Sequence, residues 1–243
     1  MNKGKQFDYE SINPGYYDII FRKNSGVQSK WHHLKFFHVQ KEIVAPCRHL
    51  DIGCGPGTFI GTLSEGIISY GVDISKKQIE YANKHYQNEY KSFQQIFVGR
   101  EFPFEDNSFD VVTIIEVIEH LRKDQALSLL DQSYRMLRPG GKIIITTPNY
   151  KSFWPLLEVL LNSCGQISYQ DQHINRYCKR SLYNQMLESG FKSVKINCFQ
   201  SVAPFFAAIN WQLSDRVYRV EQDFKQAFLG MLLLAKGEKP YES

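Results

Sequence analysis

Two acidic residues and a histidine share one short segment of this chain. Glu116, Glu119 and His120 follow an apolar run, and they would lie on one face if the segment opens a helix, since residues three and four apart are neighbours there. Two carboxylates and an imidazole on one face favour either a metal site or a group that transfers protons. His173, farther along the chain, is a fourth candidate for this site. His120 and Glu116 are the candidate catalytic residues.

A second segment has the pattern of a strand, a glycine loop and a helix. An apolar strand ends near Asp51, and Gly53, Gly55 and Gly57 follow at alternate positions, a spacing one residue shorter than the dinucleotide fingerprint. Glycine lets the backbone turn sharply and approach a ligand, and a helix beginning near Gly57 directs free N–H groups at the loop. A carboxylate at this place would repel a diphosphate but attract a cationic or zwitterionic group. The segment therefore predicts a cofactor site.

The elements that must position these residues form an alternating series. From residue 47 to 147 predicted strands and helices alternate, which is typical of a parallel sheet with right-handed crossovers. The second strand ends at Asp73, where a carboxylate can bind both hydroxyls of a ribose. Helices are predicted at 30–43, 75–86 and 125–137, the last ending at a Pro-Gly-Gly stop signal, and further strands at 93–98, 111–115, 142–147, 192–199 and 228–235. Ligands bind such sheets beyond the carboxyl ends of the strands, where Glu116 would follow the fourth strand.

Four motifs in this chain occur in an order and spacing that resemble one known family. They are 50–57 (LDIGCGPG), 71–73 (GVD), 104–112 (FEDNSFDVV) and 137–141 (LRPGG). With them, residues 45–150 resemble the class I S-adenosylmethionine-dependent methyltransferases. The resemblance implies an enzyme with a Rossmann-like α/β fold, in which a seven-strand, mostly parallel, doubly wound sheet ends in an antiparallel strand. An oxidoreductase of Rossmann type and a non-catalytic relative are the alternatives.

The resemblance also assigns the cofactor contacts. It implies that the glycine loop holds the methionine half of S-adenosylmethionine and that Asp73 holds its ribose. The implied cofactor-binding residues are Asp51, Gly53, Cys54, Gly55, Gly57, Asp73 and Ile74. Many relatives carry an acid after the third strand that contacts the adenine, and Glu101 is the candidate here, in a stretch that is shorter than usual.

The acidic cluster resembles that of two methyltransferase groups. Its E-x-x-E-H pattern with a downstream histidine is most similar to the ubiquinone-biosynthesis O-methyltransferases, and it is also similar to the small-RNA 3′-end 2′-O-methyltransferases. In both groups the cluster is associated with a divalent metal ion of the Mg²⁺ or Mn²⁺ type, which implies Glu116, Glu119, His120 and His173 as ligands. Mixed carboxylate and imidazole ligands suit Mn²⁺ better than Mg²⁺. Relatives without a metal use the first histidine as a general base or pack it beside the cofactor, and these alternatives stay open.

The segments outside the motifs are rich in apolar residues. Residues 1–45 contain many aromatic residues and are expected to form an N-terminal helical cap, as core packing or as a substrate lid, ahead of a methyltransferase domain at 46–243. Apolar insertions at about 151–175 and 200–225 are either core helices or walls of an acceptor pocket. The first, which contains Trp154, is also a candidate for peripheral membrane contact.

Composition limits the classes of partner. The chain has 243 residues and a formal net charge of +4, with scattered basic residues, so we predict one α/β domain and no nucleic-acid partner. The five cysteines include no C-x-x-C pair and predict neither a disulfide framework nor a zinc knuckle. An apolar signal core is absent, and no segment approaches the roughly 18–20 apolar residues that span a bilayer. We therefore expect a cytoplasmic protein, with peripheral membrane contact as the alternative.

The expected reaction is O-methylation of a small or lipid-like acceptor. The sulfonium of the cofactor is already activated, so the protein must chiefly align a nucleophile with the methyl group, while a hydroxyl must also lose its proton. A metal ion or the His120 imidazole would assist that loss. The alternatives are methyl transfer to RNA, to a polysaccharide or to a natural-product intermediate, and a scaffold that binds the cofactor without catalysis.

Overall fold

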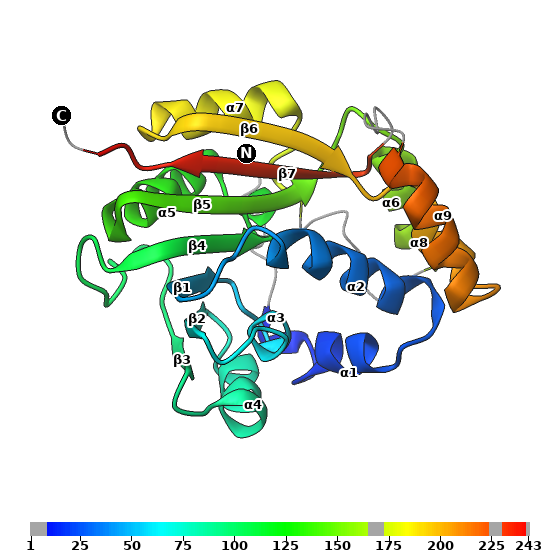
Figure 1. The fold of residues 1–243 in the computed structure, drawn as a ribbon, viewed down its shortest axis with the longest axis horizontal. Coiled ribbons are helices and arrows are strands. Elements are labelled where there is room, and N and C mark those ends of the chain that lie inside the picture. The colour runs from blue at the N-terminus through cyan, green and yellow to red at the C-terminus, as the bar shows by residue number, and fades with distance from the viewer. Residues whose placement is uncertain (1–8, 165–172, 224–229, 242–243) are drawn as a thin grey trace, which may run out of the picture.

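A single twisted sheet organises the fold (Figure 1). The computed structural model describes residues 9–164, 173–223 and 230–241. Its seven strands follow the order β3-β2-β1-β4-β5-β7-β6, in which β7 runs antiparallel to both neighbours and the remaining pairs are parallel. The predicted seven-strand, mostly parallel α/β sheet with an antiparallel last strand is therefore confirmed.

The strand positions agree with the sequence prediction except at three strands. The strands are β1 (Cys47–Ile52), β2 (Ile67–Asp73), β3 (Lys91–Gln95), β4 (Phe109–Ile115), β5 (Leu137–Pro148), β6 (Lys192–Phe199) and β7 (Leu232–Glu238). β3 lies two to three residues before its predicted place, and β7 lies after its own. β5 begins at Leu137 because the Pro-Gly-Gly sequence is not a helix stop but an irregularity inside the strand, where pairing with β4 shifts between Phe109 and Val111.

Helices cover both faces of the sheet. They are α1 (Tyr16–Arg22), α2 (Gly26–Gln40), α3 (Thr58–Gly61), α4 (Lys76–Tyr86), α5 (Lys123–Met136), α6 (Trp154–Cys164), α7 (Lys179–Glu188), α8 (Ala203–Phe206) and α9 (Trp211–Asp223), with short 3₁₀ turns η1 (Tyr9–Ser11) and η2 (Ile118–His120). α4 has the predicted bounds because the Ser75 hydroxyl caps it, accepting from the Gln78 N–H at 3.3 Å. α2 begins and ends earlier than predicted, at Gly26 and Gln40.

Two apolar layers hold these helices on the sheet. On one face, Leu130 of α5 and Met186 of α7 pack in the same cluster as Leu50 and Val112 of the central strands. On the other face, Phe36 and other residues of α2 pack with residues of α3, β1 and β5. The parallel strands are therefore buried on both sides, as a doubly wound sheet requires.

The predicted N-terminal cap is attached to α4 by a buried carboxylate. Asp18 of α1 is fully buried, accepts hydrogen bonds from the hydroxyls of Tyr81 and Tyr86, and pairs with Arg22 at 2.8 Å. α2 is held from its other side by α9, where the Tyr218 hydroxyl lies 2.8 Å from Nε2 of His38. Residues 1–8 of the predicted cap, and 165–172 and 224–229 near the predicted insertions, lie outside the described residues.

None of the described helices is long and apolar enough to cross a membrane. The predicted apolar insertions instead contribute α6, α8 and α9, which lie near the end of the sheet where α2 also packs (Figure 1).

Candidate active site

A cavity of about 1030 Å³ lies at the carboxyl ends of the parallel strands. The glycine loop after β1, Asp73 at the end of β2 and the acidic cluster after β4 all contribute to its lining. Of the predicted site residues, all but Gly57 and Glu101 line this cavity. The topology therefore brings the two predicted sites together, as expected for an open parallel sheet.

The glycine loop has a shape that other residues would not adopt. Gly53 has a φ of +79°, and a Cβ there would lie 2.3 Å from Cγ2 of Val117. Gly57 has a φ of +78° and is packed against the Phe93 ring, which excludes a side chain at this position too. Gly55, with a φ of +52°, has nothing within 4 Å of an added Cβ, so its backbone is open to a ligand. The loop is thus held by packing at two glycines and accessible at the third.

Asp51 is a buried carboxylate beneath this loop. Asp51 is 2% exposed, and its Oδ1 accepts a hydrogen bond from the Thr113 hydroxyl at 2.6 Å. Burial raises the pKa of Asp51 to about 7, and the nearby charge of Asp73 adds to the rise. A cationic group of a ligand would favour the ionised form.

Asp73 is already engaged by the loop. Its Oδ2 accepts from the Gly55 N–H at 2.9 Å, and its Oδ1 accepts from the Ser75 N–H at 2.8 Å. Burial raises the pKa of Asp73, and these two hydrogen bonds act in the opposite direction. Each carboxylate oxygen retains a second lone pair, so Asp73 can still accept from ligand hydroxyls.

The segment that carries the acidic cluster is not the helix that the spacing suggested. β4 ends at Ile115, Glu116 has a left-handed φ of +56°, and η2 is a single turn over Ile118–His120. Glu116 is thereby separated from the other two residues. Its Oε2 lies 3.2 Å from Nζ of Lys35, a buried residue of α2.

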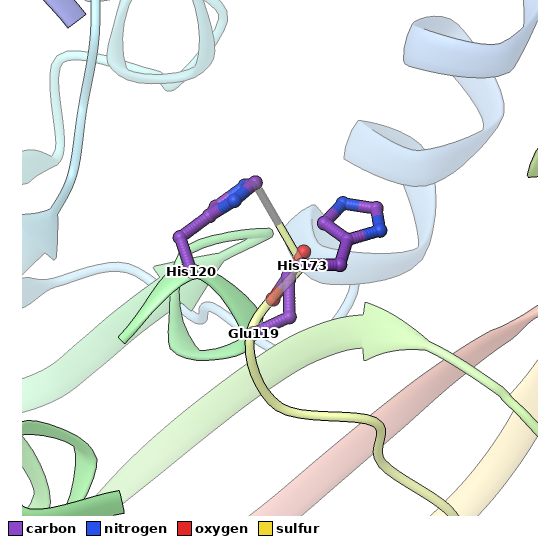
Figure 2. A group of neighbouring side chains, drawn as sticks. All are labelled: Glu119, His120 and His173. Atoms are coloured by element: carbon purple, nitrogen blue, oxygen red, sulfur yellow. The ribbon is translucent and has the colours of Figure 1, made fainter. Parts of the chain in front are cut away.

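Glu119, His120 and His173 come together instead. Each offers a ligand atom, and these atoms lie within 4.8 Å of one another (Figure 2). The backbone brings His173 here, since the N–H groups of Ile174 and Asn175 donate to the Glu119 carbonyl at 2.8 and 2.9 Å. Among the described residues, the predicted four-residue set thus reduces to a compact group of three.

Glu119 is the most buried member of this group. It is 1% exposed, and its Oε2 accepts from the Thr147 hydroxyl at 2.9 Å, while its buried Oε1 has no hydrogen-bond partner in the described structure. Burial, and then the charge of Glu116, raise the pKa of Glu119. A buried polar atom without a partner is costly, so Oε1 is suited to accept a ligand from the cavity.

Aromatic side chains from three helices gather in the lining of the cavity. The Trp31 ring of α2 lies 5.8 Å from that of Trp154 in α6 and 6.4 Å from that of Phe205 in α8. All three residues line the cavity, as does Leu157. The cap and both predicted insertions therefore contribute to an apolar wall.

One further predicted residue lies away from the cavity, and two residues near the site were not predicted. Glu101 is exposed, pairs with Arg135 at 3.4 Å and lies outside the cavity lining, to which Phe97 and Phe102 contribute instead. Lys35 and Glu158 were missed. The signal for Glu158 is a single acid within an otherwise uncharged helix, whereas no local pattern distinguishes Lys35.

Comparison with known proteins identifies the class. Residues 50–145 match the family model of a methyltransferase domain. A demethylmenaquinone methyltransferase of Oceanobacillus iheyensis is 25% identical over 172 residues, which cover 62% of this chain and 71% of that protein. A ubiquinone biosynthesis O-methyltransferase of Coxiella burnetii is 29% identical over 115 residues, which cover 46% of this chain and 48% of that protein.

The fold comparison agrees. A crystal structure of an S-adenosylmethionine-dependent methyltransferase from Thermotoga maritima has a TM-score of 0.64 at 19% identity, covering 92% of this chain and 94% of that one. The matched methyltransferase domain and the shared fold support an S-adenosylmethionine-dependent methyltransferase, with S-adenosylmethionine as its cofactor.

The residues present fit that cofactor. Asp51 is a buried carboxylate that a cationic group would stabilise, Asp73 has lone pairs for a pair of hydroxyls, and Gly55 leaves its backbone open. Cys54 and Ile74 line the cavity beside them. We keep the individual contacts as predictions.

We expect the affinity for S-adenosylmethionine to fall as the pH falls below about 7. The raised pKa of Asp51 means that protons compete with a cationic ligand below this value, and the limiting loss is about tenfold per pH unit. Above about pH 7, Asp51 is ionised, so its contribution to the affinity no longer changes with pH. Isothermal titration calorimetry across this range measures the effect, and Asp51→Asn serves as the control because its remaining pH dependence belongs to other groups. Equal pH dependence in the variant and the parent would contradict the assignment.

Proposed function

We propose that this protein is an O-methyltransferase for a hydrophobic, lipid-like acceptor, and that Glu119, His120 and His173 hold a divalent metal ion beside the methyl group. The observation that carries this proposal is the convergence of the three ligand atoms within 4.8 Å in a cavity with an aromatic wall. The quinone methyltransferases among the relatives are consistent with such an acceptor.

The chemistry of the donor set supports a metal ion. One carboxylate and two imidazoles suit Mn²⁺, Fe²⁺ or Co²⁺, and Glu119 supplies an unpartnered carboxyl oxygen, Oε1, that is already desolvated. A bound ion would lower the pKa of an acceptor hydroxyl and so favour its attack on the methyl group. Glu116 pairs with Lys35 and lies outside this group of three, so we assign it to acceptor positioning rather than to the ligand set.

The remaining contributions come from the chain itself. The glycine loop and Asp51 fix the methyl donor, while Trp31, Trp154 and Phe205 give an apolar acceptor a surface from which water is excluded. Holding both reactants in one cavity supplies the alignment on which methyl transfer chiefly depends.

A second function of the same cluster is general-base catalysis by His120 without a metal ion. It is favoured by the proximity of the His120 and His173 rings, whose centroids are 5.0 Å apart in the cavity lining. His120 would then accept the hydroxyl proton directly. The two functions share every residue, so they are separated by metal dependence.

Removal of divalent metal should abolish turnover and leave cofactor binding intact. None of the three ligands belongs to the glycine loop, so chelation should remove activation of the acceptor without removing the methyl donor. We would measure transfer of a radiolabelled methyl group to a fractionated extract, with and without chelator and after Mn²⁺ is restored. S-Adenosylmethionine affinity is the control.

The distribution of the label tests the acceptor class. Label in the organic phase that is lost on chelation supports the proposal. Full activity after exhaustive chelation would refute the metal site and leave His120 as the base, and label confined to the RNA or glycan fraction would refute the lipid-like acceptor.

A further inference from the structure

A single charged residue interrupts the apolar helix beside the active site. Glu158 is the one Asp, Glu, Lys, Arg or His in the α6 sequence WPLLEVLLNSC. Its side chain is only 12% exposed, and it faces His173, whose side chain is 4% exposed. Burying a carboxylate in an apolar helix is costly unless the group is hydrogen-bonded, so its partners indicate its role.

The partners of Glu158 form a closed arrangement around one nitrogen of His173. Oε1 of Glu158 lies 2.6 Å from Nδ1 of His173. The Tyr150 hydroxyl lies 3.0 Å from both carboxylate oxygens and 3.0 Å from the same Nδ1. A carboxylate only accepts, so the arrangement is satisfied when Nδ1 carries a proton and both N–H and O–H donate to Glu158.

We propose that Glu158 is a positioning residue that keeps the proton of His173 on Nδ1 and directs the Nε2 lone pair toward Glu119 and His120. The two imidazole nitrogens are distinct, and the hydrogen bond made by one determines whether the other can act as a ligand or base. Histidines that bind metals commonly donate their other N–H to a carboxylate, which orients the ring and raises its basicity. Where it concerns the metal, this inference rests on the proposed function.

One helix, α6, carries both the proposed acceptor wall and the carboxylate that contacts His173. Trp154 and Leu157 of α6 line the cavity, and the Trp154 ring lies 6.0 Å from that of His173. Displacement of α6 would therefore move the acceptor wall and the carboxylate that orients His173 together.

The direct test is the tautomer of His173, measured by ¹⁵N NMR of the histidine rings in the full chain. The ¹⁵N shifts distinguish which ring nitrogen carries the proton, and His173→Gln assigns the signals of this ring. We expect the proton on Nδ1 in the parent chain and a loss of this preference in Glu158→Ala. A proton on Nε2 in the parent, or an unchanged tautomer in Glu158→Ala, would overturn the proposal.

Metal affinity provides a second readout. Titration with Mn²⁺ should show binding about 10–100-fold weaker in Glu158→Ala, with Glu158→Gln between that variant and the parent. Leu156→Ala is the matched control, since Leu156 lies on the same helix, is exposed and does not line the cavity. S-Adenosylmethionine affinity should stay unchanged in all three variants and reports their folding.

The two readouts separate this inference from the proposed function. If the parent chain binds no Mn²⁺, the proposed metal site is refuted, while the tautomer measurement still decides the role of Glu158. If Mn²⁺ binds equally to the parent and to Glu158→Ala, the metal site stands and the positioning role is refuted.

Discussion

Glu119→Gln should lower methyl-transfer turnover by about 100-fold or more and leave the affinity for S-adenosylmethionine unchanged. Glutamine has the same shape and can keep the hydrogen bond from Thr147, but it lacks the negative charge that the unpartnered Oε1 offers to a metal ion. Single-turnover assays with saturating cofactor measure the loss. Glu105→Gln, an exposed acid outside the cavity lining, is the matched control.

Stability measurements test whether Glu119→Gln loses activity because it unfolds. Because the pKa of Glu119 is raised in the folded chain, its ionisation destabilises the fold increasingly as the pH rises above the ordinary value for a glutamate. Glutamine cannot ionise, so the melting temperature of the variant at neutral pH should equal or exceed that of the parent. An active Glu119→Gln enzyme would refute the metal site and favour His120 acting alone.

Asp51→Asn should weaken S-adenosylmethionine binding by about 100-fold. Removing one member of a buried charge pair costs about 2–5 kcal/mol. Each loss of about 1.4 kcal/mol weakens binding tenfold. Asparagine can still accept the hydrogen bond from Thr113, so the loop beneath Gly53 should keep its shape. Calorimetric titration of the cofactor measures the change, and unaltered affinity would show that Asp51 does not contact a cationic group.

The same substitution should stabilise the ligand-free chain. The pKa of Asp51 rises from 3.8 to about 7 on folding, so its ionised form penalises the folded state more and more between these values and fully above them. Asp51→Asn should thus raise the melting temperature at neutral pH and have little effect near pH 4, where the aspartate is protonated when folded. Loss of affinity combined with a gain of stability is the signature of a residue retained for binding.

Local sequence determined the frame of this protein. Glycines at three alternate positions permit the positive φ of the loop, and the serine at residue 75 caps the helix that follows, so these conformations follow from local rules. Alternating strands and helices then determined a parallel sheet, and with it the edge at which Asp51, Asp73 and the acidic cluster meet. The exact limits of α2, β3, β5 and β7 escaped this reasoning, because helix packing and strand pairing are not local.

The tertiary structure alone decided how the active-site side chains are paired. Lys35 and Glu116 are 81 positions apart, and their ion pair exists because α2 packs across the sheet. The left-handed turn at Glu116 separates that residue from Glu119, although their spacing suggested one helical face. His173 reaches Glu119 through backbone hydrogen bonds, and Glu158 reaches His173 from another helix. Residue spacing specifies which groups a segment carries, whereas burial and the packing of distant segments determine which of those groups meet.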